Sequence, residues 1–124
     1  MAGADKNLIA PEWRALCRVD DIGDGESKGF PPAPGGFTGL FGVRKGEKVF
    51  VYVNSCPHIG VPLNWRDDDF LTLDKIRIIC ASHGAEFKIT TGECLHGPCA
   101  GEHLEAIVVE IRDGVVFVPP DAGL

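Results

Sequence analysis

Short apolar segments separated by turns run along most of the chain, and this pattern predicts β-strands. Residues 40–44 and 49–53 are rich in β-branched and aromatic side chains and flank a polar turn at 45–47, which predicts a hairpin. Residues 12–22 fit either a short helix or a strand, and we favour a strand over 15–19 because glycines follow soon afterwards. No apolar run approaches the ~18 residues that a membrane span needs.

The rest of the chain continues this pattern with shorter segments. Further strands are predicted at 77–80, 86–89, 106–112 and 115–118. Asp113-Gly114 joins the last two and is typical of a type I′ hairpin turn. A turn of helix is predicted only within 67–75. Residues 23–36 hold five glycines and three prolines, which predicts a surface loop whose two flanking strands pair with each other. The fold class is therefore all-β, a small antiparallel sandwich or barrel.

Length and charge narrow the possible functions. The 124 residues fit a single domain over 1–124. Twelve Lys and Arg against 18 Asp and Glu give a net charge of −6. Nucleic acids and anionic membranes bind basic surfaces, so we predict neither as a partner and favour a basic protein. The first residues show no basic segment followed by an apolar stretch, so we predict no signal peptide and a cytoplasmic location.

Cysteine and histidine recur in two short motifs, each following a predicted strand. CPHIG contains Cys56 and His58, and CASHG contains Cys80 and His83, with 21 residues between His58 and Cys80. Thiolate and imidazole are ligands for zinc, copper and iron–sulfur centres. The glycine near each histidine permits positive φ and a close approach of backbone N–H groups to an anionic centre. The two motifs together predict one metal centre.

These motifs resemble those of the Rieske [2Fe–2S] family, which read C-x-H-x-G and C-x-x-H-G. The resemblance implies one [2Fe–2S] cluster per chain. Cys56 and Cys80 would ligate one iron, and His58 and His83 would ligate the other.

The resemblance also implies how the domain is divided. A cluster-binding subdomain would occupy roughly 54–100 and consist of two loops plus a proline cover loop at Gly97-Pro98. A base of β-strands would be formed by roughly 12–53 and 101–120.

In such a centre, protein ligands and sulfides fill the coordination of both irons. The resemblance therefore implies an electron carrier and not an enzyme with its own substrate site. The chain is similar to the ferredoxins that serve ring-hydroxylating oxygenases. The implied partners are redox proteins, namely a flavin-dependent reductase and a terminal oxygenase or similar enzyme.

Two other functions fit part of the pattern. One is an accessory or regulatory subunit of a larger reductase, resembling the small subunit of nitrite reductase. Such subunits often lose cluster ligands, so the presence of all four favours the carrier. The other is a structural Cys₂His₂ zinc site, although the spacing is unlike that of zinc fingers.

The residues that follow each motif bear on the reduction potential. Rieske proteins of high potential carry an extra cysteine in each motif and a serine after the histidine-glycine pair. Here Val61 and Ala85 follow the two glycines, and neither device is present. Fewer hydrogen bonds to the sulfurs predict a potential near the lower end of the Rieske range, about −150 mV.

The chain contains other cysteines and histidines that are candidate metal ligands. Cys94-Leu95-His96 repeats the C-x-H spacing, with Cys99 close by, but it lacks the following glycine. We predict that Cys94, His96 and Cys99 shape the cover loop without binding metal. A Cys94–Cys99 disulfide is possible in principle but unsupported in the cytosol. Cys17 is predicted to be a buried strand residue, and His103 to be solvated.

The acidic run 67–69 lies between the two motifs. It fits either a solvated loop or a negative rim that orients a basic partner near the cluster.

Overall fold

The computed structural model describes residues 13–32, 38–57, 62–64, 67–81, 84–97 and 99–122. The elements are β2 (Arg14–Arg18), the 3₁₀-helix η1 (Val19–Asp21), β3 (Ser27–Phe30), β4 (Leu40–Lys45), β5 (Lys48–Val53), β6 (Arg77–Ile79), β7 (Glu86–Lys88), β8 (Cys94–His96), β9 (Ala106–Ile107), β10 (Glu110–Arg112) and β11 (Val115–Val118). Within the described residues, no helix is long and apolar enough to cross a membrane.

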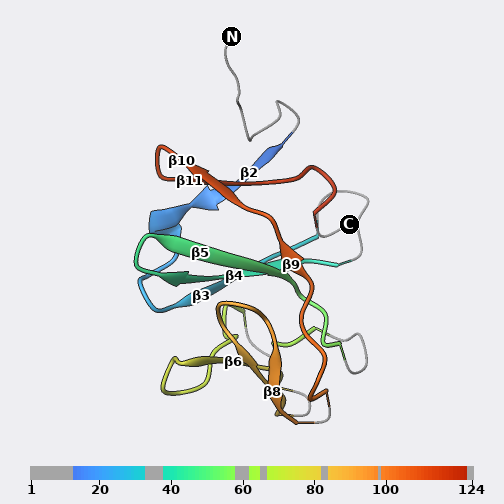
Figure 1. Cartoon of the computed structure of the whole chain (residues 1–124). Coiled ribbons are helices and arrows are strands. Elements are labelled where there is room, and N and C mark those ends of the chain that lie inside the picture. Colours follow the sequence, from blue (N-terminus) through green and yellow to red (C-terminus); the bar gives the residue numbers. More distant parts are fainter. Residues whose placement is uncertain are drawn as a thin grey trace.

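The described residues form three antiparallel sheets, which are stacked along the long axis of the molecule (Figure 1). The strand orders are β10-β11-β2 at the top of the view, β3-β4-β5-β9 in the middle and β6-β7-β8 at the bottom. The prediction of an all-β antiparallel fold is confirmed.

The middle sheet is buried on both faces because its apolar residues point alternately to opposite sides. Along β5, Val49 and Val51 pack into one core, whereas Phe50 and Tyr52 pack against another. Successive strand residues point to opposite faces, so this continuous apolar run serves two cores.

We call these the upper core and the lower core. The upper core lies between the top and middle sheets and consists of Val19, Ile22, Leu40, Val49, Val51, Val116, Val118 and Ala122. The lower core lies between the middle and bottom sheets and consists of Phe41, Val43, Tyr52, Cys56, Leu63, Phe70, Leu71, Ile78, Cys80, Ala85, Phe87, Ile89, Cys94, Cys99 and Leu104.

Aromatic residues of the middle sheet attach the lower part of the molecule. Phe41 of β4 stacks on Phe70 with ring centroids 4.4 Å apart and an interplanar angle of 5°. The hydroxyl of Tyr52 donates a 2.6 Å hydrogen bond to the carbonyl of Ile89, just beyond β7. These buried contacts fix the bottom sheet against β4 and β5.

Most of the predicted strands are present. The hairpin predicted at 40–44 and 49–53 is β4 and β5, and the strands predicted at 77–80 and 86–89 pair as β6 and β7. The strand predicted over 15–19 is β2. Asp113 and Gly114 have φ values of 52° and 76°, as a type I′ turn requires.

The loop predicted at 23–36 contains a strand, so that prediction is wrong in part. β3 pairs with β4, and β2 pairs with β11 instead of with the strand that follows the loop. The N–H of Gly29 donates to the Asp68 carboxylate at 2.8 Å, and the Ser27 hydroxyl donates to the Asp68 carbonyl at 2.7 Å. A residue 39 positions away therefore helps to fix this segment, and local composition could not reveal it.

Two further predictions need correction. The strand predicted over 106–112 is divided, because β9 pairs with β5 in the middle sheet and β10 pairs with β11 in the top sheet. Val108 lies at the crossing and is 68% exposed. No helix forms over 67–75, where Asp68 and Lys75 adopt φ values of 64° and 66° that interrupt a right-handed helix.

Candidate metal centre

Each predicted cysteine ligand follows a strand that ends beside the lower core. Cys56 lies three residues beyond β5, and Cys80 immediately follows β6. Both side chains are completely buried and belong to the lower core. The structure thus brings the two motifs to one side of the molecule, although 23 residues separate the two cysteines in the sequence.

Asn54 and Leu63 connect the two motifs through hydrogen bonds. The side chain of Asn54 accepts from the N–H of Leu63 at 2.9 Å and donates to the Asn64 side chain at 3.0 Å, which closes the base of the loop containing Cys56. The carbonyl of Leu63 then accepts from the N–H of Ala81, next to Cys80, at 2.8 Å. Sequence reasoning missed both residues. An asparagine directly after a strand was the only signal, since its side chain favours turns.

The second motif folds back on itself in a tight turn. Cys80 donates its N–H to the Ala85 carbonyl at 2.8 Å and accepts from the N–H of Gly84 at 2.8 Å. Gly84 has a φ of +72°, which confirms why glycine is needed after the second histidine. Gly60, the glycine of the first motif, lies outside the described residues.

The two predicted histidine ligands, His58 and His83, also lie outside the described residues, as does Pro98 of the predicted cover loop. Their roles therefore stay predictions. The described residues on either side are Pro57 and Pro62 for the first loop and Ala81 and Gly84 for the second.

A third loop packs against the second motif. Gly97 lies so close to Ala85 that a β-carbon at position 97 would be 2.7 Å from the Ala85 α-carbon. On either side of Gly97 are two buried cysteines, Cys94 and Cys99, whose sulfur atoms are 2.8 Å apart. Burial, the hydrogen bond with Cys94 and the charges of Cys94 and Cys56 raise the pKa of Cys99 to about 12. Cys99 shares the lower core with Cys56.

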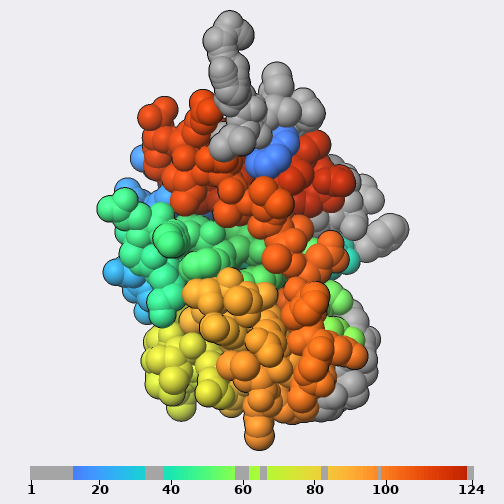
Figure 2. Space-filling model, viewed as in Figure 1, coloured from blue at the N-terminus to red at the C-terminus, as the bar shows by residue number. Residues whose placement is uncertain are grey.

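The remaining candidates are accounted for individually. His96 and His103 are both exposed, which confirms the prediction for His103. Cys17 is half-buried on β2, where burial and the charge of Asp21 raise its pKa to about 11. It packs against the upper core, and its strand β2 lies at the opposite end of the molecule from β6 and β8 (Figure 1). In the space-filling view of Figure 2, the blue segment around β2 is likewise far from the yellow and orange segments around β6 and β8.

The acidic run is exposed but not uniformly solvated. Asp67, Asp68 and Asp69 all have exposed side chains. The Asp68 carboxylate nevertheless accepts the Gly29 N–H, so this residue stabilises β3. Only Asp67 and Asp69 fit the alternatives of a solvated loop or a steering rim.

The comparisons with known proteins now define the class. The family model of the Rieske [2Fe-2S] domain matches residues 12–112. The chain belongs to the Rieske [2Fe–2S] domain family and carries one [2Fe–2S] cluster. This result replaces the alternative of a structural zinc site. No curated protein gives a match.

Solved structures agree on the fold. A chain in the complex of reduced oxygenase and oxidised ferredoxin of carbazole 1,9a-dioxygenase has a TM-score of 0.70 at 24% identity, covering 93% of this chain and 99% of that one. The ferredoxin of carbazole 1,9a-dioxygenase from Nocardioides aromaticivorans IC177 has a TM-score of 0.69 at 22% identity, covering 88% and 98%. The Sphingomonas yanoikuyae B1 ferredoxin has a TM-score of 0.65 at 28% identity, covering 86% and 97%.

The donor set fits the cluster of this family. Two fully buried thiols in one core suit the iron ligated by cysteine, since thiolates are the soft ligands of iron–sulfur clusters. A surrounding shell of apolar residues, including Leu63 and Phe87, limits the access of water to such a centre.

Proposed function

We propose that this protein carries one electron on its [2Fe–2S] cluster from a flavin-dependent reductase to a terminal oxygenase or similar enzyme. Cys56 and Cys80 hold one iron, and His58 and His83 hold the other. The observation that carries the proposal is the burial of both cysteines in one core of a Rieske fold that spans almost the full length of two ferredoxins.

The charge of the centre suits transfer of a single electron. Two ferric ions, two sulfides and two thiolates sum to zero, and one added electron leaves a single negative charge. Protein ligands and sulfides complete the coordination of both irons, so the centre offers no open position for a substrate, unlike a catalytic metal site. The protein acts as a carrier in the cytoplasm, and the partner performs the chemistry.

Spectroscopy with ligand variants tests the assignment. Purified protein should be red-brown, contain about two irons and two labile sulfides per chain, and after dithionite show the low average g-value of mixed cysteine and histidine ligation. Cys56→Ser and His83→Ala should lose this spectrum. Cys17→Ser is the matched control because it changes a cysteine packed on the other core, and it should retain the spectrum. A variant of Cys56 that keeps the full cluster would refute the ligand assignment.

Function is tested by reconstituting electron flow. Protein reduced by a flavin-dependent reductase should transfer one electron per chain to a ring-hydroxylating oxygenase. The loss of the absorption spectrum of the reduced protein measures this transfer. A protein that holds the cluster but accepts no electron from any such reductase would contradict the carrier role.

A further inference from the structure

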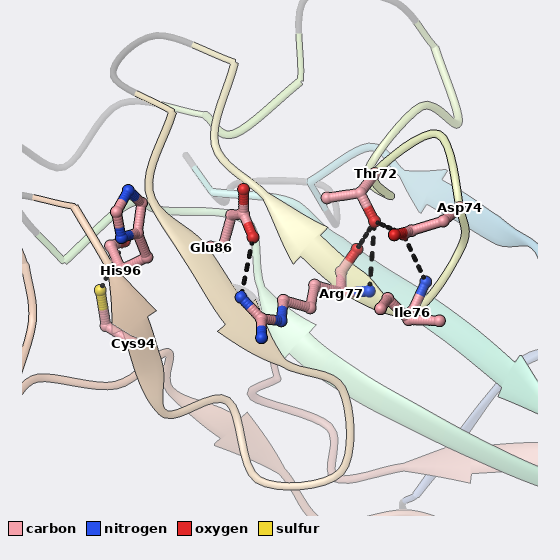
Figure 3. A network of polar contacts seen from close by, with 7 residues as sticks. All are labelled: Thr72, Asp74, Ile76, Arg77, Glu86, Cys94 and His96. Carbon is pink, nitrogen blue, oxygen red and sulfur yellow. Dashed lines mark hydrogen bonds and ion pairs between the residues drawn. The ribbon is translucent and has the colours of Figure 1, made fainter.

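Cys94 and Cys99 form a buried thiol pair that electron transfer by the cluster does not use. Their side chains are 4% and 2% exposed, and their sulfur atoms lie 2.8 Å apart. The Cys94 thiol also donates to the carbonyl of His96 at 3.5 Å, and Figure 3 shows this contact along β8. A sulfur–sulfur bond is about 2.05 Å long, so bonding requires only a small approach of the two atoms.

The backbone around the pair forms a closed turn. The N–H of Cys94 donates to the Glu102 carbonyl at 2.8 Å, and the N–H of Glu102 donates to the Cys99 carbonyl at 2.9 Å. These bonds hold the strand before the turn beside the chain that returns from it. Ala100 and Gly101, within the turn, are exposed, so local opening of this turn gives solvent access to the sulfurs without global unfolding.

We propose that Cys94 and Cys99 form a reversible disulfide, which makes the pair a redox-sensitive modification site separate from the cluster. The oxidant is a small disulfide such as oxidised glutathione. One cysteine thiolate attacks it to form a mixed disulfide and releases one glutathione thiol. The second cysteine then displaces the other glutathione, which completes the protein disulfide. Two protein thiols lose two electrons, and the two glutathione sulfurs gain them together with two protons.

The position of the pair couples this modification to the cluster. Gly97 of the same turn packs on Ala85, which hydrogen-bonds to Cys80, and Cys99 shares the lower core with Cys56. The two thiols contact each other and the His96 carbonyl, so a disulfide acts on the cluster through packing. Bond formation draws the sulfurs from 2.8 Å to about 2.05 Å and shifts the turn that lies against Ala85 and Cys80, which changes the cluster potential. This coupling rests on the ligand roles proposed above, whereas the disulfide itself does not.

The test uses intact holoprotein equilibrated with glutathione from both directions. Excess oxidised glutathione should yield protein about 2 Da lighter, with peptides linked through Cys94 and Cys99, and excess reduced glutathione should reverse the change. Cluster absorption is recorded in parallel. Thiols that persist at every glutathione ratio, or a bond that joins other cysteines, would overturn the proposal.

Matched variants separate the disulfide from the cluster. Cys94→Ser should keep the cluster and lose the 2 Da change, whereas Cys17→Ser should keep both. The cluster potential should shift on oxidation in the wild-type protein and stay constant in Cys94→Ser. A wild-type potential that does not change refutes the coupling. Absence of the cluster from all samples refutes the proposed function, while mass spectrometry still decides whether the disulfide forms.

Discussion

The upper and lower cores differ in the types of side chain that they contain. Among the residues that the structure describes, the buried members of the upper core are all aliphatic and come mostly from strands of four to six residues. The lower core contains several phenylalanines, Tyr52 and four of the five cysteines, and its own sheet has strands of only three residues. Long strand ladders supply stability from the backbone. Short ladders depend on packing and on what the side chains bind, so the lower region needs the cluster more than the upper region does.

Removal of the cluster should show the largest difference between the two regions. In Cys80→Ser protein, we expect amide hydrogens of β6, β7 and β8 to exchange many-fold faster, while those of β4 and β5 remain protected, because metal binding contributes folding energy where the ligands lie. Hydrogen exchange followed by mass spectrometry checks this, with Cys17→Ser as the control. Equal loss of protection in all three sheets would show that the two regions fold as one unit.

The aromatic contact between the regions provides the next test. Phe70→Ala removes the ring stacked on Phe41 and should cost about 3–5 kcal/mol. Because Phe70 belongs only to the lower core, loss of cluster absorption should precede loss of the far-ultraviolet dichroism during urea unfolding. Leu40→Ala, in the upper core, should cost about 2–5 kcal/mol and leave the two transitions coincident. Coincident transitions in both variants would contradict the separation.

The hydroxyl of Tyr52 gives a smaller effect with a pH signature. Tyr52→Phe removes its hydrogen bond to Ile89 and leaves a buried carbonyl unpaired, which should cost about 1–2 kcal/mol. Burial raises the pKa of Tyr52 to about 12, above the value of about 10 expected in the unfolded chain. The contribution of the Tyr52 hydroxyl to the free energy of unfolding is therefore fully present below pH 10 and is lost as the pH rises from 10 toward 12.

Tyr52 is the only tyrosine in the chain, so the difference between the wild-type and Tyr52→Phe proteins isolates this titration. Urea unfolding at several pH values between 8 and 12 measures it. A difference in stability that stays constant across this range would show that the hydroxyl does not titrate as stated.

The smallest expected effect is on the rate of association with a redox partner. Asp67→Lys with Asp69→Lys should slow association with a basic partner several-fold, because steering acts mainly on the association rate. Asp68 is left intact because it holds β3. Glu47→Lys with Asp121→Lys is the control: it makes the same change in net charge on two exposed residues outside the acidic run, and it should slow association less.

Stopped-flow reduction at increasing salt measures this steering. The rate should fall as salt rises, since screening acts over about 10 Å at 0.1 M. Equal rates for both double variants would show that residues 67 and 69 are only solvated.

Sequence reasoning worked where local pattern determines structure. The β4–β5 hairpin and the Asp113-Gly114 turn follow from alternation and from turn residues, and the spacing of the two motifs identified the family. It failed where distant residues decide. β3 depends on Asp68, and the division between β9 and β10 depends on which sheet edge is open to each strand. Asn54 and Leu63 were missed because their role is to join two loops that are adjacent only in the folded chain.

The two-sided burial of β4 and β5 also limits how the gene can change. A single-residue insertion within this hairpin would exchange the faces of every residue beyond it, sending Tyr52 toward the aliphatic side and Val51 toward the cysteines. Insertions or deletions of two residues keep the same parity. Changes in the length of this ladder should therefore be tolerated in even steps, whereas the exposed turn at 46–47 lies outside the alternation and is free to vary by one residue.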